Sequence, residues 1–314
     1  MPKEKGEKAS QNAGKPGHST FSRVTMSHPV LPAGDALRLL GEKAGGNFVL
    51  MSGLEERSVG EAEWQRRVYQ DVVEAYAGEL ECEVFQCPGY FLIAPEAYSS
   101  LTELSVTPLL PVAYQELRAE ISLGAKTELY IAFALISHLL DITVVCDNFI
   151  AESPCGELRL DEMPLGSLIE ALLQSARIAP QAFSLEATAD YIFIHSKENA
   201  QPADLLLNEG ALSAEQQALL EKRIVTFALP SVNPAQRELL FDGEVMPLKD
   251  ALHPLTVQAG IEIVCHRKLA DIPVNPFVFT DVTLRDALNL LIRQWPLPLF
   301  GYEVQEDRIL LREK

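Results

Sequence analysis

One order of predicted strands and helices recurs along this chain and limits the folds that it can adopt. In its clearest form, over residues 237–312, an extended apolar run passes at Pro247 into a helix that stops at Gly260. An apolar strand follows over residues 261–264, and a second extended piece, residues 274–280, leads into another helix and two closing strands. This order predicts a small unit of mixed α and β structure.

The second helix of this unit has the strongest pattern in the chain. Its apolar residues recur at spacings of three and four, which places them on one face. They are Leu284, Ala287, Leu288, Leu291, Ile292 and Trp295. Thr283 can cap the first turn, and Asp286 stands three residues later, as in a capping box. We therefore expect this helix to begin near Thr283 and to bury its apolar face in a core.

The same order recurs twice upstream. In residues 117–196 a strand, a helix and a β-branched apolar strand precede a second helix that Pro164 opens, with the apolar spacing just described. In residues 20–95 the first helix ends at Gly45, but the strand before it is poorly marked. There we expect a second helix from Glu61 to Ala77, with Trp64 on its apolar face.

These copies predict an α+β fold of three tandem small domains, each with two helices packed on short mixed β-sheets. The second linker carries a short helix opened by a capping box at Ser213 and an extra strand over residues 223–229, which either adds to the sheet of the third copy or bridges that copy to the second. The boundaries are a disordered tail 1–19, a divergent first domain 20–95, a linker 96–114, a second domain 115–196, a linker 197–236 and a third domain 237–314.

The third copy resembles the short domain found at the N-terminus of secretins and of TonB-dependent transducers. The resemblance rests on PLKDAL at residues 247–252, GIEIV at 260–264, FTDVTLRDAL at 279–288, and the hairpin that ends with RILL at 308–311. The second copy matches in spacing, with Asp141 near the place of the glycine. The resemblance implies protein-binding domains of the periplasm or cell envelope, which stack into rings in secretins and contact a regulator in transducers.

Composition and charge exclude several classes of protein. The formal net charge is −18 and the pI is near 4.8, which opposes binding to nucleic acid. We expect no membrane insertion, because no run of about 18 apolar residues occurs. Residues 1–19 lack the apolar core of a secretory signal, so a cytoplasmic location is the alternative to the cell envelope.

Catalytic and metal-binding motifs are missing from the sequence, so we expect no enzyme, cofactor or metal site. Cys265 and His266 are adjacent, but neighbours on a strand point to opposite faces. The five cysteines do not have zinc-site spacing, and a bridge between Cys146 and Cys155 stays open. His138 is predicted to be a helix-surface residue, and Asp161 with Glu162 to complement a helix dipole.

Two functions remain. The first is an interaction or assembly protein that binds partners, or itself in stacked rings, through the edges of its sheets. Its candidate interaction edge is the closing strand formed by Arg308, Ile309, Leu310, Leu311 and Arg312. The alternative is a ligand-binding or enzymatic protein with a site in the cleft between the second and third copies, near residues 211–233.

Overall fold

The computed structural model describes residues 22–199, 201–228, 246–295 and 300–314. The predicted tail 1–19, and most of the extended run expected before Pro247, lie outside these residues. The fold is a mixed α and β structure with several small sheets, which confirms the predicted α+β class. Within the described ranges no helix is long and apolar enough to cross a membrane.

The first repeat shows the arrangement that the others follow. Its first strand pairs antiparallel with its fifth, its third pairs parallel with its last, and the last two form a hairpin. Its elements are β1 Arg23–His28, β2 Leu31–Pro32, α1 Ala33–Ala44, β3 Phe48–Leu50, β4 Ser58–Val59, β5 Ala62–Val68, α2 Tyr69–Glu79, β6 Glu83–Cys87 and β7 Tyr90–Ala94.

The second repeat has the same pairings, β8 with β10, β9 with β12, and β11 with β12. Short helices connect it to the first repeat: η1 Glu96–Glu103, η2 Thr107–Leu109 and α3 Val112–Gln115. Its elements are β8 Arg118–Leu123, α4 Leu129–Leu140, β9 Val144–Cys146, α5 Asn148–Ala151, β10 Leu158–Pro164, α6 Leu165–Ser175, β11 Phe183–Ala187 and β12 Ile192–Ser196.

The third repeat pairs β13 with β17, β15 with β19, and β18 with β19. Helix α7, Ala214–Leu220, precedes it and begins at the predicted capping box of Ser213. The elements of the repeat are β13 Arg223–Ala228, β14 Met246–Pro247, α8 Leu248–Ala259, β15 Glu262–Cys265, β16 Pro273–Val274, β17 Phe277–Thr283, α9 Leu284–Arg293, β18 Phe300–Val304 and β19 Arg308–Glu313.

The backbone conformation identifies equivalent positions in the three repeats. The first helix of each repeat ends in a left-handed residue, Gly45, Asp141 or Gly260; glycine, or a short polar side chain, adopts this conformation most readily. A second left-handed residue lies where the register of the long strand pair shifts: Arg66, Glu162 and Asp281. Each of these two left-handed positions lies 96 residues later in the second repeat than in the first, and 119 residues later in the third repeat than in the second.

One expectation about the repeats is wrong. Trp64 lies on strand β5, not on a helix, and its indole packs edge-on against Tyr76 of α2. The extra strand expected over residues 223–229 is β13, which pairs with the long strand β17 of the third repeat, in the place that β1 and β8 have in the other two. The first strand of the first repeat, which the sequence marks weakly, is β1.

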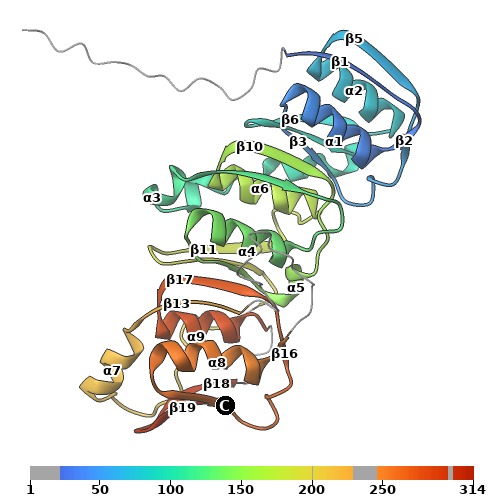
Figure 1. The fold of residues 1–314 in the computed structure, drawn as a ribbon. Helices are drawn as coiled ribbons and strands as arrows, with labels where there is room; N and C mark the ends of the chain where they lie inside the picture. Colours follow the sequence, from blue (N-terminus) through green and yellow to red (C-terminus); the bar gives the residue numbers. More distant parts are fainter. Residues whose placement is uncertain (1–21, 200, 229–245, 296–299) are drawn as a thin grey trace, which may run out of the picture.

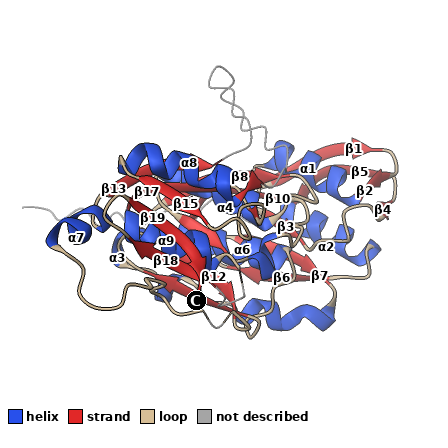
Figure 2. Cartoon of the chain, turned by 90° about the horizontal axis from the view of Figure 1, so that it is seen from below, coloured by secondary structure: helices blue, strands red, loops and turns tan. Residues whose placement is uncertain are grey.

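Helix layers alternate with sheets along the molecule. Figure 1 shows the repeats one below another, with β1 and β5 at one end and β18 and β19 at the other, and Figure 2 looks from the latter end. A five-stranded sheet, β6-β7-β3-β10-β8, joins the first two repeats, and one hydrophobic cluster runs from Val24 to Ile194. A second cluster fills the third repeat and includes Val145 and Phe193 of the second. The division into three separate domains stays a prediction.

Candidate functional site

The joins between repeats show which surfaces of this fold bind one another. In the first join, β10 pairs antiparallel with the edge of β3, and the N–H of Leu50 donates to the carbonyl of Glu157 at 2.8 Å. Asn47 lies just before β3, and its side chain both accepts from the N–H of Asp161 at 2.8 Å and donates to the carbonyl of Asp161 at 3.3 Å. The edge of one repeat is thus completed by the long strand of the next.

The sheet of the first repeat also lies on helix α6 of the second. The hydroxyl of Tyr90 donates to Oε1 of Gln174 at 2.6 Å, and the hydroxyl of Ser175 donates to the carbonyl of Leu50 at 3.2 Å. Burial is the main reason why the pKa of Tyr90 lies well above its ordinary value, and nearby Glu170 adds to it. All eleven residues of α6 are buried, because both sides of the helix are covered.

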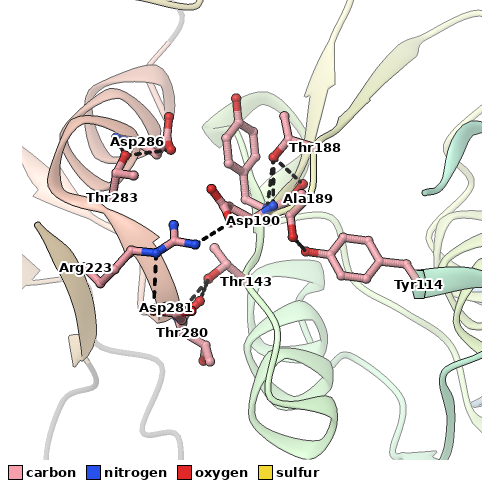
Figure 3. A network of polar contacts seen from close by, with 11 residues as sticks. Tyr114, Thr143, Thr188, Ala189, Asp190, Arg223, Thr280, Asp281, Thr283 and Asp286 are labelled. Carbon is pink, nitrogen blue, oxygen red and sulfur yellow. Dashed lines mark hydrogen bonds and ion pairs between the residues drawn. The ribbon is translucent and has the colours of Figure 1, made fainter. Parts of the chain in front are cut away.

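The second join uses the corresponding positions. Thr143, two residues after Asp141 as Asn47 is two after Gly45, accepts from the N–H of Thr280 at 2.8 Å and donates to its carbonyl at 3.3 Å. Figure 3 shows this pair beside Arg223, whose guanidinium lies 2.9 Å from Asp190 and 3.4 Å from Asp281. In the second join the hydrogen bonds of the Thr143 side chain take the place of the β10–β3 strand pairing of the first join.

Helix α9 lies under the second sheet as α6 lies under the first. Arg293 is 2.6 Å from Glu186, and its guanidinium lies over the ring of Phe193, 4.4 Å from the centroid. Burial acts to raise the pKa of Glu186, but hydrogen bonds from Arg293 and Tyr191 outweigh it and hold the pKa below its ordinary value. Eight of the ten residues of α9 are buried.

The third sheet ends in an edge and a face that correspond to these joins. Within the described residues β15 has β19 on one side and no strand on the other. We call the side turned away from α8 and α9 the outer face; its side chains are those of Glu262, Val264, Glu303, Arg308, Leu310 and Arg312. Arg312 lies 2.7 Å from Glu303 on this face. Val264 is paired with Leu310 across the sheet, as Val49 is with Leu92 and Val145 with Phe193.

Exposure separates the third sheet from the other two. The two earlier pairs are at most 5% exposed, because the next repeat covers them. Val264 and Leu310 are only partly buried. The third sheet therefore presents a half-exposed apolar pair between Arg308 and Arg312, beside an unpaired strand edge.

The opposite end of the molecule presents the complementary elements. In the described part of the chain β5 pairs with β1 alone, whereas β10 has a strand on both sides. Five of the eleven residues of α2 are buried. We call the exposed surface of β5 and α2 the head face; its exposed polar residues are Glu63, Gln65, Arg66, Arg67, Asp71, Glu74 and Glu79.

The predicted interaction edge is wrong as an edge. Strand β19, which carries Arg308 to Arg312, lies between β15 and β18 and is paired on both sides. The order of strands in the hairpin could not reveal this, because the parallel pairing of β19 with β15 joins segments far apart in sequence. Ile309 and Leu311 are fully buried in the core, while Arg308, Leu310 and Arg312 lie on the outer face.

The structure also shows the surroundings of the cysteines and histidines considered from the sequence. Cys265 is half-buried, which raises the pKa of its thiol, and His266 is exposed and donates its N–H to the carbonyl of Leu311. All five cysteines are free thiols, so Cys146 and Cys155 do not form a bridge. His138 is exposed on α4, as expected. The described residues hold no cluster of three or more potential metal ligands.

The cleft expected near residues 211–233 includes residues 229–233, which lie outside the described part of the chain. Among the described residues of the second and third repeats there is a cavity of about 10 Å³, lined by Tyr130, Phe133, Val144, Val145, Cys146, Asn275, Pro276, Phe277 and Gln294. That volume holds about one water molecule. A larger open hollow of about 420 Å³ lies elsewhere, between the first two repeats, and Glu170 and Gln174 line it.

The sequence did not single out Asn47 or Thr143, the side chains that hold the joins. The one available signal is a polar residue directly before a short apolar strand. No protein-family model, curated protein or solved structure matches this chain.

Proposed function

We propose that this protein is a non-enzymatic assembly protein that binds another protein chain at the free end of its third sheet. The partner adds a strand to the edge of β15 and covers the outer face. The observation that carries the proposal is the partial exposure of Val264 and Leu310 beside the unpaired edge of β15. The equivalent pairs in the first two repeats are covered by the next repeat of the chain. Sheet edges and half-exposed apolar pairs are common means of binding protein.

The proposal also rests on the resemblance of the third repeat to the N-terminal short domains of secretins and TonB-dependent transducers. Those domains bind protein in the cell envelope, so we propose that location and a role in a secretion, pilus-type or signalling assembly. The cytoplasm is the alternative. The alternative function stays that of a ligand-binding or enzymatic protein with a site in a cleft between the second and third repeats near residues 211–233, of which residues 229–233 lie outside the described part of the chain.

The proposal is tested by site-specific photo-crosslinking in cells of the source organism. A photoreactive amino acid at Leu310, on the outer face, is expected to give discrete crosslinked bands. The matched control is the same amino acid at Leu139, an apolar residue of α4 that is 48% exposed. Cys265→Pro, which removes the outward N–H at the edge of β15, is expected to abolish the bands at 310. Equal labelling at both positions, or none at 310, would show that the outer face binds no protein.

A further inference from the structure

We propose that the partner at the outer face is the head face of a second copy of this chain. In this arrangement β5 of one copy lies beside β15 of another, and α2 lies beneath the sheet β15-β19-β18. This inference rests on the proposed function and specifies its partner.

The chain already contains this interaction in two versions. In the first join a long strand completes the edge of β3, and in the second join Thr143 fastens the corresponding long strand β17. The unpaired edge of β15 corresponds to the edge of β3, and the free side of β5 corresponds to the side of β10 that β3 occupies. A second copy would make the sheet β18-β19-β15-β5-β1, in the same order as β6-β7-β3-β10-β8.

The second helix of each repeat, α2, α6 or α9, is buried to a different extent, and this difference indicates which helix lacks a covering sheet. Helix α6 is buried at eleven of eleven residues and α9 at eight of ten, because each lies between its own repeat and the sheet of the preceding repeat. Helix α2 is buried at five of eleven. Among the described residues no sheet covers the exposed side of α2, and no helix covers the outer face of the third sheet.

One pair of opposite charges meets across the proposed contact. Arg308 stands two residues before Leu310, as Tyr90 stands two before Leu92, and Tyr90 lies close to Glu170 and Gln174 of the next repeat. Glu170 corresponds to Glu74, by the spacing of 96 residues. In the docked pair Arg308 of one copy therefore faces Glu74 of the other.

A second pair of polar positions corresponds to an ion pair in the first join. There Arg38 lies 2.8 Å from Glu157. The equivalent residues at the two free ends are His253 on α8, which is exposed, and Glu61, which is also exposed. In the docked pair His253 of one copy and Glu61 of the other meet where Arg38 and Glu157 meet in the first join, so both pairs of positions favour the same orientation.

An interaction between two different faces does not close on itself. Each bound copy presents a new free end, so copies add head to tail into an open series, unless the rotation between them closes a ring. A terminal repeat with a polar outer surface can also be a cap that prevents association. The test therefore has to separate a head face that binds from one that only caps.

The test uses sedimentation velocity of the full chain and two blocked variants. Leu310→Arg blocks the outer face and Ala75→Arg blocks the head face; both positions are partly exposed, and circular dichroism checks that the variants fold. The wild type is expected to sediment faster as concentration rises. Each variant alone is expected to be monomeric. Their mixture is expected to give one 1:1 dimer that grows no further, because each variant keeps one working face.

A charge exchange provides the second readout. Glu74→Arg and Arg308→Glu are each expected to weaken association about tenfold or more, and the double variant is expected to recover most of it. A monomeric wild type at all concentrations, a mixture of blocked variants that does not dimerise, or a double variant weaker than both single variants would overturn the inference. If crosslinks at Leu310 reach only a different protein, this inference fails and the proposed function stands. If position 310 gives no crosslink, the proposed function itself fails.

Discussion

At the scale of single residues, the first join depends on a position without room for a side chain. A Cβ atom on Gly156 would lie 2.1 Å from the carbonyl oxygen of Leu50 and 2.9 Å from the backbone of Ser52. We expect Gly156→Ala to lower the free energy of unfolding by about 1–3 kcal/mol or more, because backbone atoms have to move. Urea unfolding measures this. Gly124→Ala, where a Cβ meets nothing within 4 Å, is the control, and an equal loss in both variants would contradict the steric explanation.

A buried carboxylate gives the fold a pH dependence. Asp147 is fully buried, and its Oδ2 accepts from the N–H of Ser196 at 2.9 Å and from the amide of Asn199 at 3.0 Å. Burial nevertheless raises the pKa of Asp147 above its ordinary value of 3.8. Between 3.8 and the raised pKa the folded chain binds more protons than the unfolded chain, so this carboxyl makes the fold less stable as the pH rises through that window.

Asp147→Asn removes that dependence while keeping one oxygen as an acceptor for Ser196 and Asn199. We expect the difference in unfolding free energy, variant minus wild type, to become more positive as the pH rises from about 4 to 7. Urea titrations at several pH values measure it. Comparison with the wild type cancels the contributions of other titrating groups. A difference that is constant with pH would show that Asp147 is not protonated more readily in the folded chain.

At the scale of elements, the place of β13 as the first strand of the third repeat makes a prediction. Ile224 is fully buried against the third core, and its neighbour Val225 is 58% exposed on the other face of the strand. We expect Ile224→Ala to lower the free energy of unfolding by about 2–5 kcal/mol and Val225→Ala to change it little. Thermal and urea unfolding of both variants checks this. Similar small effects would mean that β13 contributes nothing to the core.

Helices with strong local signals could be predicted from the sequence. Helix α9 begins at Leu284 with the side chain of Thr283 accepting from the N–H of Asp286, and α8 ends at Gly260 in a left-handed conformation, both as expected. The signals lie within one or two turns of chain, so no distant segment is needed to read them.

Elements that depend on distant partners could not be predicted in this way. Residues 62–68 form a strand because β1 pairs with them, although the apolar spacing around Trp64 also fits a helix. The left-handed conformation of Arg66 accompanies the register shift of that pairing, and its own side chain gives no sign of it. The central place of β19, and with it the location of the free edge at β15, likewise follows from a parallel pairing across the repeat.

At the scale of the whole molecule, the hydrophobic clusters do not follow the three repeats. Leu37 of α1 and Leu168 of α6 belong to one cluster, although they lie in different repeats, and Leu288 of α9 belongs to the other. A shared sheet and a shared core couple the first two repeats. Hydrogen bonds, ion pairs and a small apolar contact hold the third. We therefore infer that the chain unfolds in two cooperative units.

Calorimetry of three core variants tests this. Leu37→Ala, Leu168→Ala and Leu288→Ala each remove a fully buried leucine, at an expected loss of about 3–5 kcal/mol for the unit concerned. We expect the first two variants to lower the midpoint of the same thermal transition by several degrees and the third to lower another. Three transitions, each sensitive to one variant, would instead support three independent domains. A single transition lowered by all three would mean that the second join couples the units as tightly as the shared sheet does.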